Sequence, residues 1–173
     1  MIKVNVSQLR EIAKDLRAGD KILLSGKVYT ARDAAHARMI KSLDSGENLP
    51  FDIKDAAIYY AGPTPEKNGL SIGSCGPTTS SRMDVFSPRL LDLGLVAMIG
   101  KGERSEAVTE AQIRNGALYL VAIGGAGALY ARQIKSCKEI AFFDLGCESV
   151  KELELVDLPV VVGIDALGGN LFK

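Results

Sequence analysis

The sequence carries no net charge: its 173 residues hold 21 Lys and Arg against 21 Asp and Glu. Proteins that hold nucleic acid by its backbone or bind anionic lipid usually have a basic excess, so neither class of partner is expected. With 47% apolar and 24% charged residues, the composition is typical of one soluble globular domain that can bury a core without metal or disulfide. A cationic site must therefore be assembled locally, from distant parts of the chain.

Long apolar segments are also missing. The N-terminal segment carries charges such as Lys3 and Arg10 and lacks the apolar centre of a secretory signal. The uncharged stretch Gly116–Ala131 is shorter than the roughly 20 residues that a spanning helix needs. The three cysteines are odd in number and widely spaced, which is typical of a reducing compartment. We expect no secretory signal, no membrane segment and a cytoplasmic location.

Several catalytic motifs are absent as well. Histidine occurs once, as His36, which excludes a metal site built on two histidines. Neither a Gly-x-Ser-x-Gly elbow nor a Gly-Lys-Ser/Thr phosphate loop occurs, so a hydrolase triad and this type of nucleotide site have no support. Cysteines that hold an iron–sulfur cluster usually include closely spaced ones, whereas the nearest pair here is Cys137 and Cys147. A cluster bound by this chain alone is therefore disfavoured.

Apolar periodicity predicts alternating strands and helices within one α/β domain, residues 1–173. Short apolar runs of this kind are typical of strands that are buried on both faces of a largely parallel sheet, where strand ends and helix starts form the binding edge. The predicted strands are residues 21–25, 27–30, 55–61, 95–100, 117–123, 139–144 and 159–164. The predicted helices are residues 6–16, 32–43, 79–93, 104–115 and 126–137.

The segment Ser74–Asp84 has the richest polar chemistry at that edge. Gly76 and Pro77 suit a turn into a helix, and hydroxyls follow at Thr78, Thr79, Ser80 and Ser81. If the helix begins near Thr78, Arg82 lies one turn further on. The helix start, the Thr78 hydroxyl and the Arg82 guanidinium could then receive a carboxylate together. Ordinary N-capping beside a surface arginine is the alternative.

Two further cations follow predicted strands. Arg32 stands in the first turn of a helix, where the dipole disfavours a cation unless an anion compensates it. Lys101 lies between Gly100 and Gly102, which leave room for a ligand. A surface salt bridge and a solvated loop lysine are the alternatives. Because Arg32, Arg82 and Lys101 would emerge at one edge of a chain balanced in charge, we predict that they bind an anionic substrate.

The loop Gly124–Ala128 suggests nucleotide binding as a rival function. The dinucleotide fingerprint would need glycine in place of Tyr130, although Asp144 lies at about the expected distance for a ribose ligand. Close packing of a helix on the sheet explains these glycines equally well. A non-catalytic docking or regulatory domain is a second rival.

Five segments, in their order along the chain, resemble the β subunit of class I iron–sulfur hydro-lyases, the family of fumarate hydratase and L(+)-tartrate dehydratase. The resemblance covers nearly the whole chain, and it implies a single swivelling β/β/α domain of three layers with a mixed sheet, like the C-terminal domain of single-chain relatives. The segments are Gly26–His36, Ala61–Thr64, Gly76–Asp84, Met98–Gly102 and Gly124–Ala128.

The resemblance also implies a heteromeric enzyme of α2β2 type that reversibly hydrates a small dicarboxylate, with fumarate to (S)-malate first and the tartrate dehydratase reaction as the alternative. A partner α subunit would hold a 4Fe–4S cluster through three cysteines, and this chain would bind no metal.

The resemblance assigns residue roles by motif position. Thr78 would move the C3 proton, while Asp33 and His36 would orient one of the arginines, Arg32. The substrate carboxylates would be bound by Arg32, Arg82 and Lys101, and the turn would be supported by Gly76, Pro77, Thr79 and Ser81.

Overall fold

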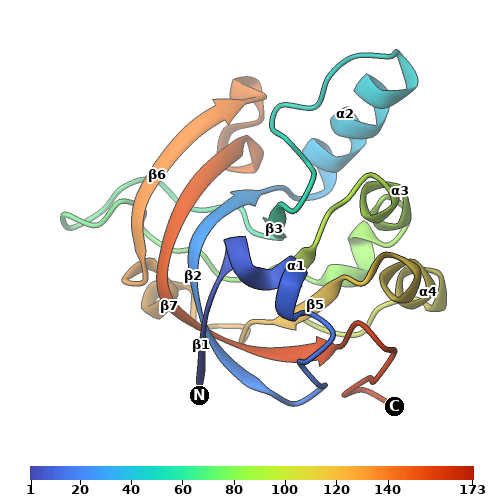
Figure 1. The fold of residues 1–173 in the computed structure, drawn as a ribbon. Helices are drawn as coiled ribbons and strands as arrows, with labels where there is room; N and C mark the ends of the chain where they lie inside the picture. Colours follow the sequence, from blue (N-terminus) through green and yellow to red (C-terminus); the bar gives the residue numbers. More distant parts are fainter.

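All strands join into one sheet in the order β1-β2-β3-β4-β5-β7-β6, and β2 also pairs with β7. The computed structural model describes residues 1–173 (Figure 1). The second pairing closes β2, β3, β4, β5 and β7 into a five-stranded barrel. The strands are β1 (Ile2–Asn5), β2 (Lys21–Thr30), β3 (Ala57–Tyr59), β4 (Ala97–Gly100), β5 (Leu118–Val121), β6 (Ile134–Ala141) and β7 (Val150–Ile164).

The strands from β1 to β5 pair in parallel, whereas β7 is antiparallel to β2, β5 and β6. Strand β7 is 15 residues long and therefore reaches three partners. Midway along β2 and β7 the register shifts, Gly26 (φ 108°) and Asp157 (φ 53°) take up positive φ, and the Asp157 N–H donates to Ser25 Oγ at 3.0 Å. A bulge of this kind bends both strands, which helps the sheet to close.

The central strands are apolar on both faces because both faces are buried. Alternate side chains such as Tyr59, Ile99 and Leu120 fill the barrel. Their neighbours Ile58 and Met98 belong to a second cluster outside it. This arrangement was predicted from the short apolar runs and is confirmed for β3, β4 and β5.

The larger helices lie together outside the barrel (Figure 1). Buried residues of α2, α3 and α4, such as Met39, Leu90 and Val108, pack in the outer cluster. No helix combines the length and the hydrophobicity required to cross a membrane. The helices are α1 (Leu9–Ile12), α2 (Asp33–Asp44), α3 (Ser87–Asp92), α4 (Glu106–Asn115) and α5 (Gly127–Ala131), with 3-10 turns η1 (Val6–Gln8), η2 (Ser80–Met83) and η3 (Phe143–Glu148).

The predicted mixed α/β class is confirmed, whereas the three-layer arrangement is not, since the sheet closes into a barrel. Three predicted helices are wrong in part. The one over 6–16 divides into η1 and the four-residue α1, which ends at Ile12. The one over 126–137 ends at Ala131, and the chain then enters β6, because β7 offers it a pairing partner. The one over 79–93 divides into η2 and α3, since Pro88 has no N–H to donate to the Asp84 carbonyl and so suits the first turn of a new helix.

Candidate active site

The loops after four parallel strands bring the predicted site residues to one edge of the barrel. Arg32 follows β2, Gly62 follows β3, Lys101 follows β4 and Gly124 follows β5. Parallel strands that are neighbours in a sheet end on the same side, where ligands of α/β proteins usually bind. The order and direction of the strands therefore place the beginnings of these four loops at one edge.

The Thr78–Arg82 segment is an extended chain that leads into a short 3-10 turn, η2, and not an α-helix. The Thr78 N–H donates to the Tyr60 carbonyl at 2.7 Å, and the Ser80 N–H donates to the Lys101 carbonyl at 2.9 Å. Because η2 has only four residues, it lacks the dipole of a helix, so the prediction of an anion-binding helix start at Thr78 is wrong. The segment is held instead by backbone bonds to the ends of β3 and β4.

Side-chain exposure differs along this segment. Pro77 is buried and Thr78 is half-buried, whereas Thr79, Ser81 and Arg82 are exposed. The segment has four threonine and serine hydroxyls, at positions 78 to 81. Ser80 is fully buried and its Oγ lies 2.8 Å from the Tyr119 hydroxyl, and of the other three residues Thr78 is the least exposed. That position suits a group that reacts at the edge of the fold.

Both predicted arginines face carboxylates of the same chain. Arg82 forms an ion pair with Asp33, so Asp33 contacts Arg82 and not Arg32, contrary to the expectation. Arg32 Nε lies 3.9 Å from Glu148 Oε1, which is too far for a hydrogen bond, and both atoms are buried without a partner. Glu148 was missed by the sequence analysis because it lies far from Arg32 along the chain.

Gly62 makes room for the Arg32 side chain. A Cβ at Gly62 would lie 3.2 Å from Arg32 Nη1 and equally close to the Cys147 carbonyl oxygen. The guanidinium is therefore confined between the β3 loop and the η3 loop. An arginine that is confined with an unsatisfied Nε is prepared to bind an incoming oxyanion.

Lys101 extends over the Gly124 loop. A Cβ at Gly124 would lie 3.4 Å from Lys101 Nζ and 3.2 Å from its Cδ. Lys101 belongs to none of the ion pairs of the chain, unlike Arg32 and Arg82. Its ammonium is thus a charge at the strand edge that no carboxylate of this chain neutralises.

The other two glycines of the Gly124–Ala128 segment have structural explanations: Gly125 adopts a positive φ of 81° and Gly127 packs closely against Gly76. A Cβ at Gly127 would come within 2.8 Å of the Gly76 nitrogen, and the Cys75 N–H donates to the Gly127 carbonyl at 3.1 Å. Asp144, the ribose ligand of the nucleotide hypothesis, lies in η3 and forms an ion pair with Arg38. Neither the glycines of this loop nor Asp144 therefore supports the hypothesis of nucleotide binding.

His36 lies in the core beneath Arg32. Its Nδ1–H donates to the Arg32 carbonyl at 2.8 Å, which leaves a lone pair on Nε2, a buried atom without a partner. The ring packs against Tyr60 and Phe86. Burial lowers the pKa of His36 from 6.5 to about 4, so the ring is neutral at pH 7. It thus contacts the backbone of Arg32 and not its guanidinium.

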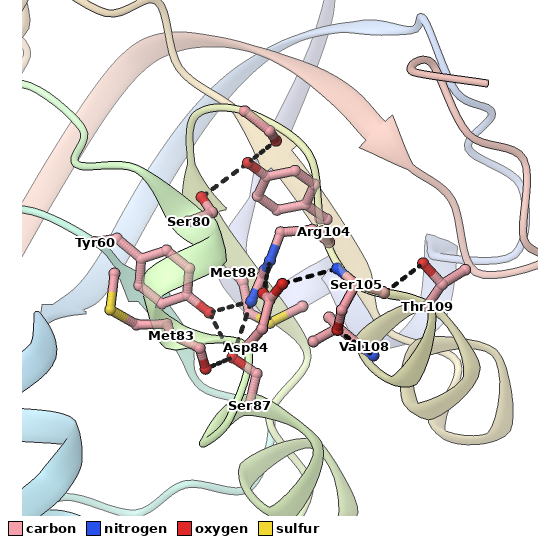
Figure 2. Close-up of polar contacts among 12 residues, drawn as sticks. Tyr60, Ser80, Met83, Asp84, Ser87, Met98, Arg104, Ser105, Val108 and Thr109 are labelled. Atoms are coloured by element: carbon pink, nitrogen blue, oxygen red, sulfur yellow. Dashed lines mark hydrogen bonds and ion pairs between the residues drawn. The ribbon is translucent and has the colours of Figure 1, made fainter.

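Arg104 is a buried cation below the site that sequence reasoning did not single out. Its guanidinium bonds to Asp84, Ser87 and Tyr60, as Figure 2 shows. Arg104 is the first residue of the helix predicted over 104–115, and periodicity carries no sign that its side chain turns inward. The ion pair with Asp84 has an Nε–Oδ1 distance of 2.7 Å, and the Arg104 side chain is 0% exposed.

The residues of this chain do not fit an iron–sulfur cluster. No group of three or more His, Cys, Asp or Glu comes together as a set of metal ligands. Cys75 is buried, Cys137 half-buried and Cys147 exposed. Burial raises the pKa of the Cys75 thiol far above its usual value, which disfavours the thiolate that binds iron.

The largest surface hollow lies away from this edge. It has a volume of about 440 Å³ and is lined by residues of β1, β2 and the segment before β3, among them Asn5, Lys27 and Asp55. It contains none of the predicted site residues. We place the candidate site by the convergence of charge at the strand edge, because a small dianion needs cations more than it needs an enclosed volume.

The whole chain, residues 1–173, matches the sequence model of the family described as the fumarase C-terminus. The chain belongs to this family. The resemblance predicted from its motifs is thereby confirmed. Within the fumarase C-terminus family, it is 39% identical to the class I aerobic fumarate hydratase of Escherichia coli (strain K12) over 155 residues, which cover 88% of this chain and 28% of that protein.

Two further relatives of this fumarase C-terminus chain are shorter proteins. It is 39% identical to a putative L(+)-tartrate dehydratase subunit beta of Methanocaldococcus jannaschii, covering 92% of this chain and 85% of that subunit. It is 34% identical to the L(+)-tartrate dehydratase subunit beta of Escherichia coli (strain K12), covering 93% and 81%. The chain therefore spans less than a third of the aerobic fumarate hydratase but most of each beta subunit.

Proposed function

We propose that this chain is the β subunit of a heteromeric hydro-lyase that reversibly adds water to a small dicarboxylate, with fumarate and (S)-malate as the first substrate pair. The observation that carries the proposal is that Arg32 and Lys101 follow parallel strands of the barrel, and that the segment with Thr78 and Arg82 is bonded through its backbone to the ends of β3 and β4. Relatives that are named as fumarate hydratase and tartrate dehydratase subunit beta support it.

The three cations would hold the two substrate carboxylates. A guanidinium offers a planar pair of donors that matches a carboxylate, whereas the Lys101 ammonium acts as a point charge. In this chain the carboxylates of Asp33 and Glu148 lie beside Arg82 and Arg32. A substrate carboxylate would compete with them for the same donors, and Lys101 would attract it without competition.

Thr78 is the group proposed to move the C3 proton in the anti addition of water. A carbon-bound proton beside a carboxylate is weakly acidic, so its removal needs stabilisation of the doubly charged aci-carboxylate that forms. Fixed cations next to that charge lower the barrier by several kcal/mol, and they also favour the alkoxide form of the threonine. Since η2 is too short to act as a helix dipole, the cations alone have to supply this effect.

We further propose that the site is completed by a partner α subunit, in an α2β2 assembly in the cytoplasm. The 4Fe–4S cluster, which would supply Lewis acidity toward the substrate hydroxyl, is assigned to that partner, because the cysteines of this chain form no ligand set.

A specific observation favours L(+)-tartrate dehydratase as the second candidate function. The beta subunits of this name match over more than four fifths of their own length, unlike the longer fumarate hydratases. Tartrate and malate are both small dicarboxylates that the same three charges would recognise. A substrate panel of fumarate, malate and tartrate distinguishes the two candidates.

The test is an anaerobic reconstitution of the chain with its α subunit. Arg82→Ala and Lys101→Ala are each expected to lower kcat/KM by about 100-fold or more, because each removes a charge that is aimed at the developing anion. Arg114→Ala, which removes an exposed arginine paired with Asp92 on α4, is the matched control and should leave turnover unchanged within about 2-fold. Unchanged turnover of both site variants would contradict the proposal.

A further inference from the structure

We propose that Arg104 is a positioning residue that fixes the three cation-bearing loops of the site relative to one another. This inference rests on the proposed function, since it concerns the same site. Unlike most arginines, Arg104 is not a surface residue. Its side chain is 0% exposed, and it lies under the loops that carry the reacting groups.

The guanidinium makes contacts through all three of its nitrogen atoms. Nε donates to Asp84 Oδ1 at 2.7 Å, Nη2 donates to Ser87 Oγ at 2.9 Å and to the Tyr60 hydroxyl at 3.3 Å, and Nη1 approaches Met98 Sδ at 3.3 Å (Figure 2). Its plane is also within 5.2 Å of the Tyr60 ring centre and 4.9 Å of the Tyr119 ring centre. Few of these contacts could be made at once by any other side chain.

The first loop that these contacts hold is the Thr78–Asp84 segment. Asp84 closes η2 at its carboxyl end, and Ser87 Oγ donates to the Met83 carbonyl at 2.9 Å. At the other end of η2, the hydroxyl of Tyr119, whose ring faces Arg104, lies 2.8 Å from Ser80 Oγ. The guanidinium therefore restrains both ends of the turn that follows Thr78.

The second loop is that of Lys101. The Asp84 carboxylate accepts the Ser105 N–H at 2.8 Å as well as the Arg104 bond, so one carboxylate joins η2 to the chain after β4. The Tyr119 hydroxyl is also 2.8 Å from the Gly102 carbonyl oxygen, and Ser80 N–H donates to the Lys101 carbonyl. The distance between Thr78 and Lys101 is thus set through this network.

The third loop is that of Arg32. The Tyr60 ring, which faces the Arg104 guanidinium, meets the His36 ring edge-on at 5.4 Å between centres. His36 Nδ1–H in turn donates to the Arg32 carbonyl at 2.8 Å. One buried guanidinium therefore connects, through one or two intermediate side chains, to all three loops that carry the proposed substrate cations.

The energetics of burial support a positioning role. A buried ion pair loses the hydration of both partners, and apolar residues of similar volume often stabilise a core as well or better. Arg104 therefore adds little stability that an apolar side chain could not supply. What it adds is direction: hydrogen bonds at fixed angles that hold three segments in one geometry.

The main test is Arg104→Lys in the enzyme reconstituted from both subunits. Lysine keeps the charge but loses the fork, so the loops should shift by a fraction of an ångström. We expect kcat to fall about 10- to 100-fold, while KM changes by less than about 3-fold, because misplaced reacting groups lower the rate more than the binding. Arg114→Lys is the matched control. Arg114 is an exposed residue of α4 that makes two hydrogen bonds to Asp92 at the end of α3, and its replacement should change neither kcat nor KM.

Tyr119→Phe is the second variant, in case Arg104→Lys does not fold. It removes only the hydroxyl that contacts Ser80 and Gly102, and we expect kcat to fall several-fold at an unchanged melting temperature. Amide hydrogen exchange of the full chain gives a readout without turnover. The Ser80 amide should exchange faster in both variants, whereas amides in the β2–β7 pairing should keep their protection.

The possible outcomes are separable. Wild-type kcat in the folded variants, or an unchanged Ser80 amide, would overturn the positioning role. A loss of kcat with equal loss of protection across β2 and β7 would also overturn it, since Arg104 would then act on stability alone. If the wild-type pair hydrates none of the three dicarboxylates, the proposed function fails, and the exchange of the Ser80 amide still decides whether Arg104 holds the turn.

Discussion

At the scale of single residues, His36 is a group whose protonation the fold suppresses within the range of pH where a histidine ordinarily titrates. The ring is wholly buried, its Nδ1–H is committed to the Arg32 carbonyl, and Tyr60 and Phe86 pack against it. Burial lowers its pKa to about 4, and the Arg104 charge nearby acts in the same direction. A protonated His36 would therefore disturb both the backbone of Arg32 and the buried arginine.

We predict that the chain becomes less stable as the pH falls from about 6.5 to about 4. The unfolded chain takes up a proton on His36 near pH 6.5, but the folded chain does not do so until the pH reaches its depressed pKa of about 4. The free energy of unfolding should therefore decrease by up to about 3 kcal/mol across this window. Urea unfolding at several pH values measures it.

His36→Phe is the control for that prediction, because it keeps an aromatic ring in the same space and removes the titrating group. Its stability should be nearly independent of pH above about 5. The carboxyls of Asp92 and Asp144, whose pKa values are lowered by hydrogen bonds from Arg114 and Arg38, titrate below this window. A slope that persists in His36→Phe would assign the effect to other groups.

A second prediction at this scale concerns Glu148, whose carboxylate lies 3.9 Å from Arg32 Nε. Glu148→Gln keeps the shape and removes a negative charge that repels the substrate carboxylates. Two unit charges about 4 Å apart interact by about 1 kcal/mol in water, and a substrate carboxylate bound to Arg32 would lie at a similar or greater distance from Glu148. KM for fumarate should therefore fall by about 5-fold or less in the reconstituted enzyme. Glu152→Gln, beside Lys27, is the control. A higher KM would show instead that Glu148 orients Arg32 for binding.

At the scale of elements, Gly124 in the loop after β5 and Gly127 at the start of α5 have different functions. An alanine substitution at each position should distinguish these functions. In Gly127→Ala the new Cβ would lie 2.8 Å from the Gly76 backbone nitrogen, so two loops must move apart. We expect a loss of about 1–3 kcal/mol in stability. In Gly124→Ala the Cβ meets only the flexible Lys101 side chain, at 3.2 Å from Cδ, so stability should hold while turnover falls.

Thermal unfolding and fumarate turnover of the two variants, measured side by side, check this contrast. A Gly124→Ala protein that is as active as the wild type would remove Lys101 from the site, because its ammonium must shift in that variant. A Gly127→Ala protein of unchanged stability would show that the two loops are not in close contact.

The sequence predicts well the elements whose own residues carry a clear signal, either an apolar run that is buried on both faces or capping residues at the ends of a helix. Strands β3, β4 and β5 are apolar on both faces, and α4 has Ser105 as its N-cap and Gly116 at its left-handed end. The first part of β7 alternates charged residues with Leu153 and Leu155, and it turns at Asp157 in a conformation that only its pairing with β2 explains. Strand β6 depends on β7 in the same way, so neither was predicted at its full length.

The candidate site shows the same division. That the loops after the parallel strands share one edge follows from the order of strands and loops, and was predicted. That Arg32, Arg82 and Lys101 bind a substrate at this edge stays a prediction. The partners of these residues were not, because Asp33 and Arg82, or Arg104 and Tyr60, are far apart in the sequence. Such pairings are settled by the packing of side chains in three dimensions, for which periodicity carries no signal.

At the scale of the whole molecule, equal numbers of positive and negative residues leave a local excess of positive charge at one end of a barrel. Carboxylates of the same chain partly neutralise that excess at Arg32 and Arg82. We expect this edge to attract an anion, whereas the chain offers no group of side chains that would bind a metal ion beside it. We therefore expect this chain to contribute substrate binding and a second protein to contribute the metal chemistry.

We predict that this chain alone has no hydratase activity, even after anaerobic incubation with iron and sulfide. Its cysteines are divided among a buried, a half-buried and an exposed position, so a cluster that assembled on them would lack the ligands to remain bound during gel filtration. The same treatment of the α/β pair should yield both the visible absorbance of the cluster and turnover of fumarate. The cationic edge is present both in the single chain and in the α/β pair. If the single chain retains iron and hydrates fumarate, the prediction is wrong, and residues of this chain bind the cluster.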